Sequence, residues 1–255
     1  MRNSILKSRP LKIITPCLIP AAVCALWYVW SKKPDSGLLF PPPAQVVTRT
    51  LSMLRSGELL AYVLESSKRA FLGFFLGGAA GFLLGLATGI SRLADRLLNT
   101  TIQMLRNIPV LALIPLMIVW FGIGEKMKVL LVAFGVFFSV YINTYHGIRA
   151  IDKKLLEMGR VYGFSPFSTF INIILPGAAP AVMVGVRLAL GIMWLVLIAA
   201  ETIATDKGIG YMAMMARSLM QMDKVLLSII LYALLGKASD AAAGALERSL
   251  FTWRI

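Results

Sequence analysis

The sequence predicts an all-α fold, a polytopic membrane bundle of about six transmembrane helices forming a single domain over residues 1–255. The first observation is composition, because 58% of the residues are hydrophobic and the mean hydropathy is +0.78. Soluble domains are only about 45–50% apolar. The second observation is a series of apolar segments of about 20 residues, the length of helix that spans the roughly 30 Å hydrocarbon core. We expect no separate soluble domain.

Six segments fit such spans, and one polar segment between the fourth and fifth is long enough to form structure of its own. The predicted spans are 12–30, 69–90, 102–121, 127–147, 178–200 and 224–243, and the polar loop is 148–177. The first span follows a basic start and ends in the aromatic residues Trp27, Tyr28 and Trp30, which are typical of a membrane interface. This length and bulky end favour an uncleaved anchor over a signal peptide. Residues 44–54 then form an amphipathic stretch.

The second span carries a glycine at every fourth position. Such a register places small residues on one helical face, where a neighbouring helix backbone can approach closely. The glycines of this stripe are Gly73, Gly77, Gly81, Gly85 and Gly89. We therefore expect this face to pack against another helix.

Four polar or charged residues lie in or beside the other spans. Arg187 lies about ten residues into the fifth span, where a charge costs about 2.5–3.5 kcal/mol on insertion scales. Two interpretations remain open: contact with an anion in a transport pathway, or structural pairing and snorkelling. The same alternatives apply to Arg106 and Asn107 near the start of the third span, which also contains Pro109. Glu201 lies at the outer end of the fifth span and is interpreted as a structural cap or a gate residue, and it is kept with Arg106, Asn107 and Arg187 as a candidate for the substrate pathway.

The polar loop has turn signals at defined positions. An apolar ridge from Leu155 to Tyr162 predicts a short helix that ends at Gly163, where a positive φ is allowed. Pro166 then starts a second short helix. Leu175-Pro176 is expected to end it, because a residue before proline avoids the helical region. Two short helices at an angle make a knob that can dock in a groove of a partner.

Charge and motifs exclude several classes of function. The 26 basic residues exceed the 12 acidic ones, for a net charge of +14, but they flank apolar segments, so we expect anionic lipid rather than nucleic acid as their partner. The two cysteines lie in one apolar segment and imply no disulfide framework. No metal-ligand cluster, phosphate-binding loop or dinucleotide fingerprint is found. We therefore expect no metal, no cofactor and no enzymatic activity in this chain.

The polar loop resembles the cytoplasmic "EAA" coupling loop of bacterial ABC importer permeases. The matching positions are Glu157, Met158, Gly159, Gly163, Ile173, Leu175 and Pro176. Met158 and Gly159 depart from the family pattern, in which alanines are usual. Other stretches resemble the sulfonate/taurine/nitrate branch, most closely its aliphatic sulfonate members. They are 103–109, 113–116, 120–122, 141–144, 146–149, 200–202 and 208–211.

This resemblance implies a type I ABC importer permease fold and import of aliphatic sulfonates across the bacterial inner membrane for sulfur acquisition. It also implies a homodimer, two cytoplasmic ATPase subunits that hold ATP and magnesium, a periplasmic substrate-binding protein, and both termini in the cytoplasm. The positive-inside rule supports this orientation only weakly. Taurine, nitrate or another small organic compound remain alternative substrates. An intramembrane enzyme would need a catalytic constellation that is not found, and a channel or scaffold would not need the coupling loop.

Overall fold

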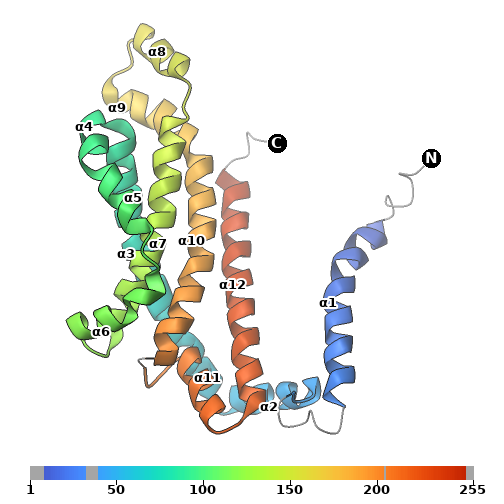
Figure 1. Cartoon of the computed structure of the whole chain (residues 1–255). Helices are drawn as coiled ribbons and strands as arrows, with labels where there is room; N and C mark the ends of the chain where they lie inside the picture. Colours follow the sequence, from blue (N-terminus) through green and yellow to red (C-terminus); the bar gives the residue numbers. More distant parts are fainter. Residues whose placement is uncertain (1–8, 33–39, 204, 251–255) are drawn as a thin grey trace. The chain divides into compact units, whose positions relative to one another are not determined.

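The computed structural model describes residues 9–32, 40–203 and 205–250, and within these ranges the regular structure is entirely helical (Figure 1). The elements are, in order, α1 (Arg9–Ser31), α2 (Pro43–Arg55), α3 (Glu58–Ile90), α4 (Arg92–Ala94), η2 (Asp95–Asn99), α5 (Thr100–Arg106), η3 (Val110–Leu113), α6 (Ile114–Phe121), α7 (Glu125–Arg149), α8 (Lys153–Val161), α9 (Pro166–Thr169), η4 (Phe170–Ile174), α10 (Leu175–Ile203), α11 (Ile209–Ser218) and α12 (Met222–Leu250). The labels η2 and η4 are π-helical turns, and η3 is a 3₁₀ turn.

Four of these helices are long and apolar enough to cross a membrane, and the number rises to five if a bent pair counts as one span. They are 58–90, 125–149, 166–203 and 222–249, and the bent pair joins 92–106 to 110–121. The first predicted span, 12–30, falls within α1, whose side chains are described only from Leu18 onward.

The chain divides into two compact units, Met1–Ala61 with Met212–Ile230, and Tyr62–Tyr211 with Leu231–Ile255. In the first unit, α2 begins with Pro43 at a position where its missing N–H costs nothing, and it buries Val46 and Met53. Its Arg49 forms an ion pair of 2.7 Å with Asp223. The predicted amphipathic stretch 44–54 is thus a helix with one buried face.

In the second unit, α7 is the central helix, with many buried side chains along its length. Its packing against α10 depends on small residues. A Cβ atom on Gly147 would lie 2.8 Å from the Cβ of Ala181, and one on Gly185 would lie 2.7 Å from the Cβ of Asn143. The hydroxyl of Ser139 donates to the carbonyl of Gly185 over 3.2 Å. Such close backbone contact is typical of helix pairs in a membrane.

The third predicted span, 102–121, is not one straight helix. Its two halves meet at an angle of 87°. The break follows from Pro109, which has extended backbone angles and no N–H to donate, and which also keeps the preceding residue out of the helical region. Asn107 ends the first half as its C-cap.

The prediction that Leu175-Pro176 ends the second loop helix is wrong. Leu175 has helical angles, and residues 166–203 form one continuous helix of 38 residues. The π-helical turn η4, which ends at Ile174 just ahead of Leu175-Pro176, explains the continuity, because the wider turn accommodates the ring and the missing donor. The side-chain amide of Asn172 also donates to the carbonyl of Ser168 over 2.9 Å.

Candidate functional site

The polar loop forms a projecting structure that we call the α8 knob, defined as residues 152–169. Asp152 caps α8 by accepting a hydrogen bond of 2.9 Å from the backbone N–H of Lys154. The helix ends in a Schellman motif, in which Phe164 N–H donates to the carbonyl of Gly159 over 2.9 Å. Gly163 has the expected positive φ of +72°. Ser165 then caps α9, with Pro166 as its first residue.

The outer surface of the knob is apolar. Val161 is 86% exposed and Tyr162 is 74% exposed, and Leu155 and Met158 continue the same ridge. Glu157 is exposed beside it. Because the chain alone leaves these large apolar side chains in solvent, the ridge has the character of a surface that another protein covers. The knob lies beyond the ends of α7 and α10 (Figure 1).

The remaining residues of the loop motif hold the knob to the helices. Gly159 is buried, and a Cβ atom there would lie 2.8 Å from the Cδ1 atom of Ile173. Ile173 and Leu175 are half-buried, and Pro176 is exposed. Close packing of α8 on η4 therefore requires a small residue at 159. Glycine fits without any change, whereas alanine would fit only if Ile173 were displaced.

The glycine stripe of α3 lies against α7 of the same chain. A Cβ atom on Gly81 would lie 2.5 Å from the carbonyl oxygen of Phe137, and one on Gly77 would overlap the backbone of Ala133. The other three glycines, Gly73, Gly85 and Gly89, would meet Val132, Thr144 and Ile148 in the same way. The stripe thus fixes the distance between α3 and the central helix.

Arg187 is held by two carboxylates of α12. Its guanidinium lies 2.9 Å from Asp240 and 3.2 Å from Glu247. Asp240 also lies 3.8 Å from Lys237, the pairing expected from their spacing. These contacts agree with the structural alternative for Arg187. Arg106 and Asn107 are exposed at the break of the bent helix pair.

Glu201 is completely buried and is surrounded by donors. It accepts hydrogen bonds from the Ser66 hydroxyl at 2.8 and 2.9 Å and from the Tyr232 hydroxyl at 3.0 Å. The backbone N–H of Gly210 donates over 2.9 Å, and Arg69 Nη1 donates over 2.8 Å. A buried carboxylate requires this number of partners. Glu201 is therefore a structural centre of this end of the bundle.

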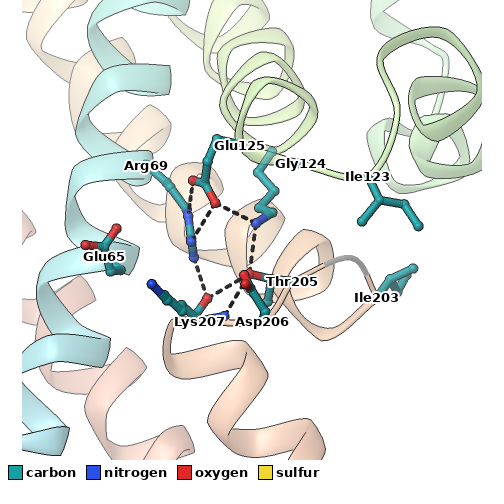
Figure 2. Close-up of a pocket in the computed structure, with 10 residues that line it drawn as sticks. Glu65, Arg69, Ile123, Gly124, Glu125, Ile203, Thr205, Asp206 and Lys207 are labelled. Carbon is teal, nitrogen blue, oxygen red and sulfur yellow. Dashed lines mark hydrogen bonds and ion pairs between the residues drawn. The ribbon is translucent and has the colours of Figure 1, made fainter.

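The contacts continue from Arg69 to α7 and to the loop before α11, beside a cavity of about 730 Å³ (Figure 2). Arg69 binds Glu125 in bidentate fashion at 2.5 and 2.7 Å and donates to the carbonyl of Lys207 over 2.6 Å. The buried Lys128 ammonium lies 2.9 Å from Glu125 and 2.8 Å from the hydroxyl of Thr205. We call this network the clamp, defined as Ser66, Arg69, Glu125, Lys128, Glu201, Thr205, Lys207, Gly210 and Tyr232.

The clamp joins α3, α7, α10 and α12 at the ends of α7 and α10 that lie away from the knob. Within it, the side chains of Arg69 and Lys128 are paired with the carboxylates of Glu125 and Glu201, whereas Lys207 takes part through its backbone carbonyl. Sequence reasoning missed Arg69 and Lys128, because they were assigned to the ends of spans. Their signal was available: a charged residue beside an apolar segment requires a partner, and Glu201 was the matching acid.

Comparison with known proteins decides the family. Residues 77–252 match the family described as binding-protein-dependent transport system inner membrane component. The chain belongs to this family. It is the membrane-spanning permease subunit of an ABC importer. Its relatives are transport permeases rather than enzymes.

Among the relatives of this permease is SsuC of Escherichia coli (strain K12), named as an aliphatic sulfonates transport permease, which is 53% identical over 94% of this chain and 92% of its own. SsuC of Bacillus subtilis (strain 168) is 42% identical over 93% and 86%. The taurine permease TauC of Escherichia coli and the nitrate permease NrtB of Synechocystis share 32% and 25%.

Solved importer structures share the fold of this permease. An amino acid ABC transporter crystallised with histidines has a TM-score of 0.64 at 17% identity, covering 78% of this chain and 97% of its own. The inward-facing MetNI methionine transporter has a TM-score of 0.59 at 20% identity, covering 73% and 95%. These similarities support the type I importer fold that the sequence predicts.

Proposed function

We propose that this permease imports aliphatic sulfonates across the bacterial inner membrane and so serves sulfur acquisition. The observation that carries the substrate assignment is the identity of 53% to a permease named for aliphatic sulfonates, against 32% to the taurine permease and 25% to the nitrate permease. Taurine, nitrate or another small organic compound is the alternative substrate. A channel or scaffold is the alternative of a different class, and the exposed apolar knob argues against it.

The working assembly that we propose is a homodimer of this chain with two cytoplasmic ATPase subunits and a periplasmic substrate-binding protein, multi-pass, with both termini in the cytoplasm. ATP and magnesium belong to the ATPase subunits. The exposed ridge at Met158, Val161 and Tyr162 supports an ATPase docking role for the α8 knob, with Glu157 at its edge. Membrane lipid surrounds the bundle, and nucleic acid has no role.

We propose that this permease works by alternating access, the mechanism that the family resemblance implies. ATP can shift the inward-open and outward-open states only through its differential affinity for them. Docked ATPase subunits would move α8. Helix α8 packs on η4 through the contact of Gly159 with Ile173, and η4 leads directly into α10. Movement of the knob would thus be carried along α10 towards the clamp. Arg106 and Asn107, at the break in the bent pair, are the exposed polar candidates for the pathway.

Uptake of a radiolabelled alkanesulfonate tests this proposal. A strain that lacks this chain should lose uptake, and a plasmid copy should restore it. An excess of unlabelled taurine or nitrate should compete poorly with the labelled alkanesulfonate. Restored uptake that taurine abolishes and longer alkanesulfonates do not would instead favour the taurine alternative.

A further inference from the structure

A second cavity, of about 540 Å³, lies between the α8 knob and the ends of α3 and α7. Four cationic side chains line it, and no aspartate or glutamate does. They are Arg92, Arg149, Lys153 and Arg160. We call it the basic pocket. Its volume is within the range of ordinary ligand pockets.

Only one of these four cations is neutralised. Arg149 lies 2.6 Å from Asp95, donates to the carbonyl of Thr88 over 3.4 Å and packs over the ring of Tyr145. Within the described ranges, Arg92, Lys153 and Arg160 have no ion pair. Three unmatched positive charges in one cavity repel each other, and a bound anion would relieve that repulsion.

The position of the basic pocket fits the boundary of a membrane. The apolar spans of α3 and α7 end at Ile90 and Arg149, and both residues line the pocket. The rest of its wall is largely apolar and includes Leu156 and Ile174. Cationic heads above an apolar wall at the end of membrane spans are the usual setting in which anionic headgroups bind.

The basic pocket and the exposed ridge occupy different sides of α8. Leu156 and Arg160 line the pocket, while Met158 belongs to the ridge. Arg160 and Met158 are two residues apart, or about 200° around a helix of 3.6 residues per turn. A group in the pocket would therefore leave the ridge free for a docked protein.

We propose that the basic pocket binds a phosphate-type oxyanion, supplied by the headgroup of an anionic phospholipid or by free phosphate. The oxyanion is held by Arg92, Lys153 and Arg160 and so ties α8 to the region after α3. It thereby stiffens the connection between the knob and the transmembrane helices. This site does not depend on which substrate the permease carries.

Lipid retention by the purified full-length permease tests the proposal. The protein is equilibrated with vesicles of equal parts phosphatidylglycerol and phosphatidylcholine, and the retained lipids are counted by native mass spectrometry. Wild type should retain phosphatidylglycerol preferentially. Each removed cation should weaken retention about fivefold, so Arg92→Gln with Arg160→Gln should weaken it about 25-fold. Lys126→Gln, which removes the same charge at the other end of α7, should retain lipid as wild type does.

A second arm distinguishes the two sources of the oxyanion. Delipidated permease is titrated with inorganic phosphate while its melting temperature is followed. If phosphate raises the melting temperature of wild type in a saturable way but not that of the double variant, free phosphate is the ligand. If wild type retains phosphatidylglycerol but phosphate does not raise its melting temperature, the lipid headgroup is the ligand. Either result upholds the site. The proposal is overturned if wild type shows neither response, or if the double variant responds as wild type does. Lys153→Gln, at the exposed start of α8, replaces the double variant should that variant fail to fold.

Discussion

Glu201 is a single residue on which one end of the helix bundle depends. It is completely buried and receives hydrogen bonds from α3, α11 and α12, while its charge is matched by Arg69. Replacing it with glutamine keeps the shape but removes the charge, and it turns an acceptor into a donor that faces other donors. Breaking a buried ion pair on one side typically costs about 3–5 kcal/mol. We expect Glu201→Gln to lower the melting temperature in detergent by several degrees or more.

The control for this substitution is Glu65→Gln. Glu65 lines the cavity beside the clamp, is partly exposed and forms an ion pair with Lys68, three residues later in its own helix. Exposed pairs of this kind contribute little to stability. If Glu201→Gln melted like Glu65→Gln, Glu201 would not be the structural centre of the clamp.

Arg187 allows the structural and the pathway alternatives to be separated by a double variant. Arg187→Gln alone leaves Glu247 without its cation and Asp240 with only Lys237 at 3.8 Å, so it should lower thermal stability. Adding Asp240→Asn removes one of the two carboxylates that lost Arg187 as a partner and should restore part of the stability. Sulfonate uptake should follow stability in both variants. If the Arg187→Gln, Asp240→Asn protein had normal thermal stability but had lost uptake, Arg187 would instead act on the substrate.

At the scale of the elements, the distance between α3 and α7 is set by the glycine stripe. Gly81→Ala would place a Cβ atom 2.5 Å from the carbonyl of Phe137, whereas the same change at Gly78 meets only the Cγ1 atom of Val136 at 3.9 Å. Overpacking of this kind costs about 1–3 kcal/mol. We therefore expect Gly81→Ala to lower the melting temperature and Gly78→Ala to leave it unchanged or raise it slightly, because alanine is the better helix former. Equal melting of the two variants would contradict tight packing of this face.

The turn between α8 and α9 depends on the backbone of Gly163. No atom lies within 4 Å of the position that a Cβ would take there, so the effect of a substitution is conformational and not steric crowding. Gly163→Val should strain the positive φ of +72° and misalign the knob, while Gly163→Asn should be tolerated because asparagine adopts this region more readily. Membrane insertion should be normal in both variants, and co-purification of the ATPase should fall in Gly163→Val only. Equal co-purification from the two variants would remove Gly163 from the coupling role.

The helices and their breaks were predictable from sequence to different degrees. Uncharged runs and glycine register predict spans and a packing face, and a positive φ at Gly163 follows from its place after an apolar ridge. Prolines were harder to interpret. Pro109 breaks its helix, whereas Pro176 does not, because a π-helical turn precedes it and this turn has no signature in the residue pattern. The clamp was missed because its members are distant in sequence, and only the folded chain brings Arg69 to Glu125 and Glu201.

The knob and the clamp lie at opposite ends of the same two helices. Helices α7 and α10 each have one end at the knob and the other at the clamp, through Glu125 and Glu201. Small residues hold the two helices in close contact over the distance between these ends. We expect them to move together when the knob is displaced, because a tightly packed pair cannot bend one member alone.

We infer that the ATPase drives this permease through the exposed ridge of α8. The test is ATP-dependent sulfonate uptake into vesicles that also contain the ATPase and the binding protein. Val161→Glu places a charge on the most exposed apolar side chain of the knob, and Ile123→Glu does the same at a side chain that is 73% exposed beside the other end of α7. We expect wild type to accumulate labelled alkanesulfonate only with ATP. Val161→Glu should neither retain the ATPase nor accumulate substrate, whereas Ile123→Glu should still retain the ATPase. Full ATP-driven accumulation by the Val161→Glu protein would contradict this role of the ridge.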